Sequence, residues 1–176
     1  QDPNYAHLTP IYATSTFVYD DAEQGMRRFS GKEPGYIYSR WGNPTYREAE
    51  EKIAAMETFG VTDQHGAPLA LKAYLQSSGM AAISTLMMST LKAGDKVLSH
   101  YSLYGGTQEQ FNTLLPTFGV DAVIADLRDL NLAEDMLKQH PAIKMIYLET
   151  PANPTIQCVD IEALTKLGKQ YGKIIA

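Results

Sequence analysis

Three short segments carry the side chains and backbone groups that could do chemistry. The first is the serine segment, residues 76–82, which places Gln-Ser-Ser-Gly before the apolar stretch that begins at Met80. If a helix starts here, its first N–H groups and the two serine hydroxyls form a cup for a phosphate. The segment has neither the lysine of a P-loop nor the spacing of a dinucleotide fingerprint, which argues against ATP and NAD. A serine-capped turn without a ligand is the alternative.

The tyrosine segment, residues 100–107, reads His-Tyr-Ser-Leu-Tyr-Gly-Gly-Thr. Two glycines directly after Tyr104 allow a flat ligand to approach the backbone while the aromatic ring stacks on it. A turn that is anchored by a tyrosine is the alternative interpretation.

The asparagine segment, residues 149–154, reads Glu-Thr-Pro-Ala-Asn-Pro. Its two prolines stiffen the chain, so the amide of Asn153 is held in place to hydrogen-bond a ligand oxygen. Glu149 lies beside a predicted buried strand, and an enclosed carboxylate there needs either a partner or a raised pKa. A structural turn is again the alternative.

An alternation of strands and helices must position these segments. Short β-branched runs predict strands, and apolar residues at helical spacing predict helices between them. The predicted strands are 69–75, 96–99, 120–125, 143–148 and a strand that opens at 173; the predicted helices are 44–56, 80–91, 107–115, 132–139 and 161–171. This order predicts an α/β fold in three layers, with a mainly parallel sheet between helices. Ligands of such sheets bind where the strands lead into the helices.

Two of the helices have clear ends in the sequence. Asn43 and Pro44 are typical of the cap and the first position of a helix. Asp160 is the predicted cap of the last helix, and Gly172 its predicted end. We expect the buried face of this last helix to contain Ile161, Leu164 and Leu167.

The segments at both ends of this sequence are expected to contact other parts of the protein or a partner subunit. Residues 1–42 show no periodic element and are rich in aromatic residues, so we expect them to lie across their own domain or a partner subunit; a floppy tail is the alternative. Residues 173–176 resemble the start of a buried strand. We therefore expect this sequence to be part of a longer protein.

The composition favours a globular, cytoplasmic protein. Of 176 residues, 44% are hydrophobic and 20% charged, and the net charge of −5 argues against nucleic acid as a partner. No apolar run approaches the length needed to span a membrane. Cys158 is the only cysteine, which excludes an internal disulfide, and we expect it to be a packing residue. The four histidines are isolated, so no metal site is predicted, and we expect most of them to lie at the surface or in loops.

Taken in order, these motifs resemble the Cys/Met-metabolism family of pyridoxal-phosphate (PLP) enzymes. This family includes cystathionine γ-synthase, cystathionine lyases, methionine γ-lyase and the homoserine-ester sulfhydrylases. The matching residues are 9–12, 15–17, 38–45, 78–82, 104–107 and 149–154. The resemblance implies the N-terminal portion of fold type I of the PLP-dependent transferases, which is the aspartate aminotransferase-like fold. In that fold, residues 1–50 would be an arm that contacts a neighbouring subunit, and residues 51–176 the truncated start of the PLP-binding domain.

The resemblance also implies roles for individual residues. Gly79 and Met80 would offer backbone N–H groups to the cofactor phosphate, with Ser78 beside them. Tyr104 would stack on the pyridine ring and is the candidate for proton transfer. Asn153 would hydrogen-bond the ring hydroxyl oxygen.

Further parts of the implied site lie outside one chain or outside this sequence. Tyr38 and Arg40 would bind the phosphate of a neighbouring subunit, which requires an oligomer, expected to be a homotetramer built from two dimers. The Schiff-base lysine and the aspartate that pairs with the pyridine nitrogen are expected beyond Ala176, so this segment alone should not turn over. The link at residues 60–68 is longer than is usual in the family.

The implied reaction is γ-replacement or γ-elimination on small sulfur amino acids or homoserine esters. Methionine γ-lyases typically carry a cysteine two positions after the stacking tyrosine. Here that position is Gly106, which disfavours a dedicated methionine γ-lyase. A non-catalytic phosphate-binding α/β domain and a family member that has lost its activity are the rival hypotheses.

Overall fold

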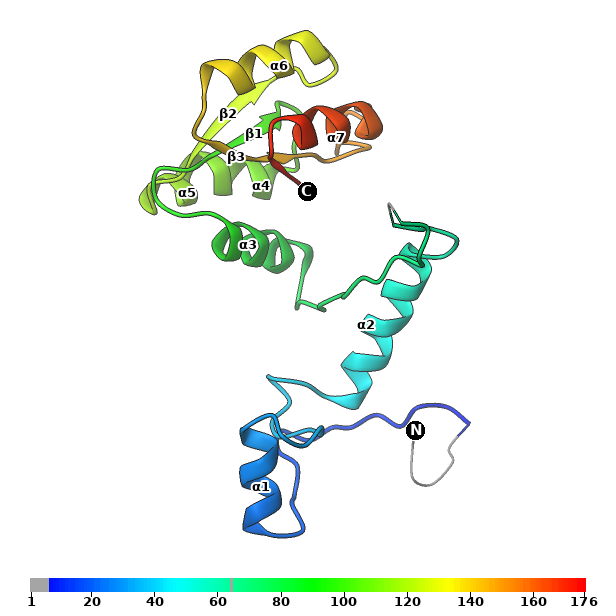
Figure 1. The fold of residues 1–176 in the computed structure, drawn as a ribbon. Helices are drawn as coiled ribbons and strands as arrows, with labels where there is room; N and C mark the ends of the chain where they lie inside the picture. Colours follow the sequence, from blue (N-terminus) through cyan, green and yellow to red (C-terminus); the bar gives the residue numbers. More distant parts are fainter. Residues whose placement is uncertain (1–6, 64) are drawn as a thin grey trace. The chain divides into compact units, whose positions relative to one another are not determined.

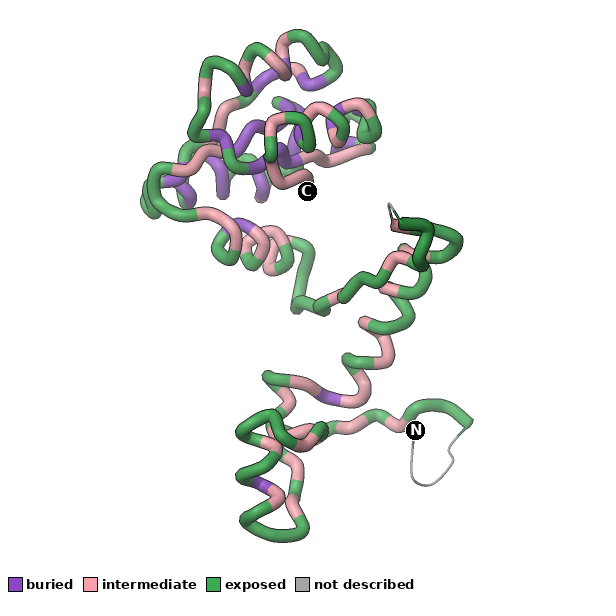
Figure 2. The backbone as a smooth tube through the Cα atoms, viewed as in Figure 1, coloured by how far each residue is buried: buried purple, intermediate pink, exposed green. Residues whose placement is uncertain are grey.

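The computed structural model describes residues 7–63 and 65–176, and its ribbon is drawn in Figure 1. The chain divides into two compact units, Gln1–Gln76 and Ser77–Ala176. The two units differ in their burial. Among the described residues, those that form a hydrophobic core all belong to the second unit, where most of the purple, buried segments of Figure 2 lie.

The first unit contains a short helix, α1 (Ala22–Phe29), where no periodic element was predicted. That prediction was wrong because polar capping, rather than apolar spacing, defines this helix. The Asp21 carboxylate accepts the Gln24 N–H at 2.6 Å, and Arg27 and Arg28 lie in the last turn. A carboxylate at the start of a helix and cations at its end both interact favourably with the helix dipole and stabilise the helix.

Helix α2 (Pro44–Glu57) begins where the sequence predicts it. The side-chain oxygen of Asn43 accepts the Thr45 N–H at 2.9 Å, and its amide donates to the Tyr12 carbonyl at 2.9 Å. Asn43, only 2% exposed, therefore caps the helix and also fastens the preceding chain to it. Within the described part of this unit only Asn43 and Gly25 are buried, so the unit has no core of its own.

The predicted strand at 69–75 is not formed. No strand lies beside it within the described residues, and an unpaired strand leaves its backbone donors and acceptors without partners. The Leu75 N–H donates instead to the Glu50 carboxylate at 3.0 Å. The long link before it closes on itself, because the Leu69 N–H donates to the Val61 carbonyl at 3.0 Å.

The second unit is built on a parallel sheet of four strands in the order β2-β1-β3-β4. The strands are β1 (Lys96–His100), β2 (Asp121–Ala125), β3 (Ile143–Tyr147) and β4 (Ile174–Ile175). The helices are α3 (Gly79–Thr90), α4 (Gly105–Glu109), α5 (Leu115–Thr117), α6 (Leu130–Gln139) and α7 (Ile161–Gln170), with a π-helical turn, Gln110–Leu114, between α4 and α5. The predicted parallel α/β fold is confirmed.

Two hydrophobic clusters, one on each face of the sheet, give the three layers. Val97 packs in one cluster with Met87 of α3 and Phe111 of the π-helical turn. Its neighbour Leu98 packs in the other cluster with Leu137 of α6 and Leu164 of α7. Successive residues of a strand point to opposite faces, so an apolar run such as that of β1 is buried on both sides. Figure 1 shows α6 and α7 on one side of the sheet and α3 and α4 on the other.

Helix α7 has the predicted ends. The Asp160 carboxylate accepts the Ala163 N–H at 2.9 Å, and Gly172 follows the helix with a φ of +63°. Leu164 is buried as predicted, and Leu167 packs against the core. Ile161 was wrongly predicted to be buried: it is 54% exposed, because the first residue of the helix lies at the rim of the sheet.

Candidate active site

Two of the three segments that the sequence identifies follow neighbouring strands. The tyrosine segment begins with His100, the last residue of β1, and the asparagine segment follows β3. β1 and β3 pair directly in the sheet. Because the carboxyl ends of parallel strands meet at one edge, the two segments lie side by side there.

The serine segment forms the start of the 12-residue helix α3. The Ser78 hydroxyl caps the helix by accepting the Ala81 N–H at 3.1 Å. The N–H groups of Gly79 and Met80 have no acceptor within the helix and lie at the positive end of its dipole. A Cβ added at Gly79 would meet nothing within 4 Å, so the space over these groups is open. This arrangement fits a phosphate group.

The side chain of Met80 reaches the tyrosine segment at Gly106. A Cβ added at Gly106 would lie 2.7 Å from Cε1 of Tyr104 and 3.1 Å from Sδ of Met80. Only a residue without a side chain allows the ring and the thioether to approach the backbone this closely. The Tyr104 ring is also 48% exposed, so part of it is available to stack on a flat ligand.

Glu149, the first residue of the asparagine segment, forms hydrogen bonds to the tyrosine segment. One carboxylate oxygen accepts the Tyr104 N–H at 2.6 Å. The other accepts the Thr107 hydroxyl at 2.6 Å and the Tyr147 hydroxyl at 3.1 Å. Burial, and after it the neighbouring carboxylate, raises the pKa of Tyr147, so its hydroxyl remains a donor.

Two more contacts fasten the asparagine segment to the tyrosine segment. The Ser102 and Thr155 hydroxyls are 2.6 Å apart, and the His100 and Gln157 side chains are 3.1 Å apart. Asn153 is exposed on the loop that these contacts hold. The sequence could not identify these partners, because they lie more than fifty positions apart and form no motif.

His100 is buried at the end of β1 and is an exception to the expectation that most histidines lie at the surface or in loops. Its Nδ1 accepts the Leu127 N–H at 3.1 Å, so the proton of the neutral ring belongs on Nε2, which donates to Gln157. The Asp126 carboxylate lies 3.6 Å from the same Nδ1. Because a neutral ring carries no charge, this contact is not an ion pair. Hydrogen bonds from Arg128 are the main reason that the pKa of Asp126 is lowered to about 2.

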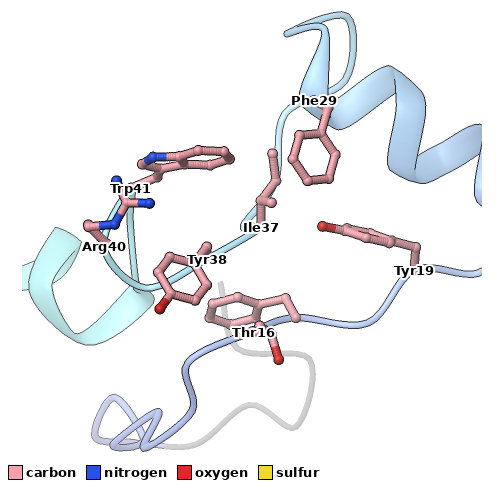
Figure 3. A pocket seen from close by; sticks show the side chains of 8 residues that line it. Thr16, Tyr19, Phe29, Ile37, Tyr38, Arg40 and Trp41 are labelled. Atoms are coloured by element: carbon pink, nitrogen blue, oxygen red, sulfur yellow. The ribbon is translucent and has the colours of Figure 1, made fainter.

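Tyr38 and Arg40 belong to the first unit, where they line a pocket of about 360 Å³ (Figure 3). The Arg40 guanidinium carbon lies 5.4 Å from the centre of the Tyr38 ring and 5.6 Å from that of Trp41. Cation–π contacts of this kind orient a guanidinium without neutralising its charge. The pocket thus presents a positive group in an aromatic setting, which suits an anion.

Other chemistries find no support in the described residues. No group of three or more His, Cys, Asp or Glu side chains among them could hold a metal ion. Cys158 is exposed, so the expectation that it packs in the core was wrong. Over residues 7–63 and 65–176, no helix has both the length and the apolar character to cross a membrane.

The parallel sheet and the open start of α3 are features of a class, the α/β proteins that bind a phosphate-bearing ligand at the carboxyl edge of a parallel sheet. A family model described as "Cys/Met metabolism PLP-dependent enzyme" matches residues 1–176. The chain belongs to this family of PLP-dependent enzymes.

Two curated relatives and one crystal structure show which members of the family the chain is similar to. An L-methionine gamma-lyase of Fusobacterium nucleatum is 46% identical over 90% of this chain and 37% of its own length. An O-succinylhomoserine sulfhydrylase of Pseudomonas aeruginosa is 36% identical over 99% of this chain and 40% of its own. A crystal structure from Campylobacter jejuni that contains N'-pyridoxyl-lysine-5'-monophosphate matches with a TM-score of 0.84 at 29% identity, over 99% of this chain and 40% of that one. The chain therefore spans about two fifths of the length of the relatives it matches.

Proposed function

We propose that the whole protein is a PLP-dependent enzyme that catalyses γ-replacement or γ-elimination on sulfur amino acids or homoserine esters. The observation that carries this proposal is the close approach of Met80, Gly106 and Tyr104, which puts an exposed aromatic ring next to the open start of α3. A phosphate and an aromatic ring that are joined by a short linkage, as in PLP, fit this pair of features.

The residues of the second unit divide the binding between them. The N–H groups of Gly79 and Met80, with Ser78 as the helix cap, bind the phosphate. The Tyr104 ring stacks on the pyridine ring, and the Asn153 amide hydrogen-bonds the ring hydroxyl oxygen. When bound, PLP withdraws electrons from the α carbon of the amino-acid substrate.

Tyr104 is also proposed as the catalytic residue of this segment of the chain. Its hydroxyl belongs to an exposed side chain at the edge where the ligand binds, and it can carry a proton to or from the substrate. The Glu149 carboxylate holds the backbone of Tyr104 by a hydrogen bond, so only the side chain needs to move when the hydroxyl transfers a proton.

The first unit is proposed to serve a neighbouring subunit. Tyr38 and Arg40 would bind the phosphate of that neighbour, and residues 1–50 would be the arm that carries them; residues 51–176 would begin the PLP-binding domain. Support comes from the absence of a core in the described part of this unit and from exposed apolar side chains such as Trp41. We propose that the protein assembles as a homotetramer of two dimers in the cytoplasm. Its proposed substrate is a small amino acid, and we propose no nucleic-acid partner.

Methionine γ-lyase activity is a second candidate. The relative at 46% identity bears that name, which favours elimination from methionine. Gly106, at the position where these lyases typically have a cysteine, argues for replacement or for cystathionine as substrate. The two alternatives differ in the product, because elimination releases a 2-oxo acid and replacement requires an added thiol.

An absorbance spectrum of the full-length protein tests the proposal. We expect a band near ~420 nm in protein purified without added cofactor, and borohydride should abolish it. Assays of methionine, cystathionine and homoserine esters, each with and without a thiol, then separate elimination from replacement. Protein that shows no such band even after PLP is supplied would contradict the catalytic proposal.

A further inference from the structure

We propose that Glu149 is a positioning residue, which fixes the backbone of Tyr104 and thereby the direction of its ring. The inference rests on the proposed role of Tyr104 toward PLP. The carboxylate of Glu149 bridges the end of β3 and the start of α4, two places that are more than forty positions apart in the chain. The side chain of Tyr104, the residue before α4, makes no capping hydrogen bond of its own.

The contacts of Glu149 fit an ionised carboxylate. One oxygen accepts the Tyr104 N–H, and the other accepts the hydroxyls of Thr107 and Tyr147. All three partners are donors, and hydrogen bonds to a charged acceptor are about twice as strong as those between neutral groups. The negative charge also lies at the start of a helix, where the dipole favours it. Thr107 is fully buried, so water does not compete for its hydroxyl.

The local sequence explains why Tyr104 needs an external clamp. Gly105 and Gly106 follow it, and glycines restrict the backbone less than any other residue. Without the carboxylate, the tyrosine segment would be free to rotate at its start. Glu149 also belongs to the segment that carries Asn153, so one side chain couples the two proposed ring-binding residues.

Substitution of Glu149 in the full-length protein tests the inference. Glu149→Leu removes every acceptor, while Glu149→Gln keeps one acceptor oxygen. The matched control is Glu109→Leu, the same change at an exposed position of α4 whose carboxylate accepts only the Thr113 hydroxyl at 2.8 Å. The first measurement is hydrogen–deuterium exchange of the Tyr104 amide in protein without cofactor. The second is the dissociation constant for PLP, and the third is kcat and KM with the best substrate.

Loss of the carboxylate should expose the amide and loosen the ring. We expect Glu149→Leu to speed exchange at Tyr104 by roughly 10- to 100-fold, which corresponds to the loss of a hydrogen bond to a charged group. Glu149→Gln should restore part of the protection, and Glu109→Leu should match the wild type. For the loaded enzyme we expect weaker PLP binding by roughly tenfold and a fall in kcat that exceeds any change in KM.

The outcomes separate this inference from the proposed function. Wild-type exchange in both Glu149 variants would overturn it, as would faster exchange with unchanged PLP binding and kcat. If Glu149→Leu does not fold, the Glu149→Gln variant tests the inference instead. In that variant the Tyr104 amide should exchange at least about threefold faster than in the control. If the wild type binds no PLP, the proposed function fails, and the exchange data still decide whether Glu149 holds the tyrosine segment.

Discussion

The buried His100 offers a direct test of how the two neighbouring segments are held together. Its Nδ1 is the acceptor for the Leu127 N–H, and its Nε2 hydrogen-bonds the half-buried Gln157 side chain. His100→Leu keeps a side chain of similar size but removes both contacts. Gln157→Leu removes only the second.

The magnitude follows from what each change leaves behind. His100→Leu strands a buried backbone donor, at a cost of about 1–3 kcal/mol, and loses the bond to Gln157, worth about 0.5–1.5 kcal/mol. The sum lowers the free energy of unfolding by about 1.5–4.5 kcal/mol. Gln157→Leu should cost about 1–3 kcal/mol, because it leaves the Nε2–H of the fully buried His100 without its acceptor. The two side chains touch, so their effects should not add, and the double variant should be less destabilised than the sum of the single ones.

Urea-induced unfolding, followed by circular dichroism at one protein concentration, measures these differences. Wild-type stability of the His100→Leu variant would refute the reasoning, because it would mean that the contact with Leu127 contributes nothing. Strict additivity in the double variant would refute the hydrogen bond between His100 and Gln157.

Three further predictions follow from single sites. A Cβ at Gly168 would overlap Cδ1 of Ile175, so Gly168→Ala should lower the unfolding free energy by about 1–3 kcal/mol, and added Ile175→Val should recover part of it in urea unfolding. The pKa of Asp126 is lowered from 3.8 to about 2, so its contribution to stability is present above pH ~4 and lost as the pH falls toward 2. Asp126→Asn should flatten the pH dependence of unfolding in that window and leave it unchanged above it. Gly106→Ala should displace the Tyr104 ring and weaken PLP binding in a fluorescence titration, with little change in thermal unfolding because the nearest atoms that the new Cβ would meet belong to side chains and not to backbone.

The sequence predicted the second unit well because its signals are local. The strands that form β1, β2 and β3 are short apolar runs, and caps such as Asp160 mark where helices begin. These patterns depend on residues only a few positions apart, so they survive without any knowledge of the tertiary structure. The strand predicted at 69–75 failed because a strand also needs a neighbour, which is not a local property.

The motifs of the proposed site were likewise visible in the sequence, but the hydrogen bonds that hold them in place were not. Tyr104, Asn153 and the start of α3 were identified by residue type and order, since glycines, prolines and small residues shape a loop wherever it occurs. Helix α1 was missed, because a polar cap on a short segment without apolar spacing gives only a weak signal.

The sequence by itself determined the family, the parallel α/β order and the residues to which the cofactor chemistry is assigned. Only the tertiary structure decided what holds those residues: Glu149 on Tyr104, Ser102 on Thr155 and His100 on Gln157. The physical reason is the topology of the sheet. Parallel strands that are distant in sequence end at the same edge, so hydrogen-bond partners that far apart become neighbours only when β1 and β3 pair.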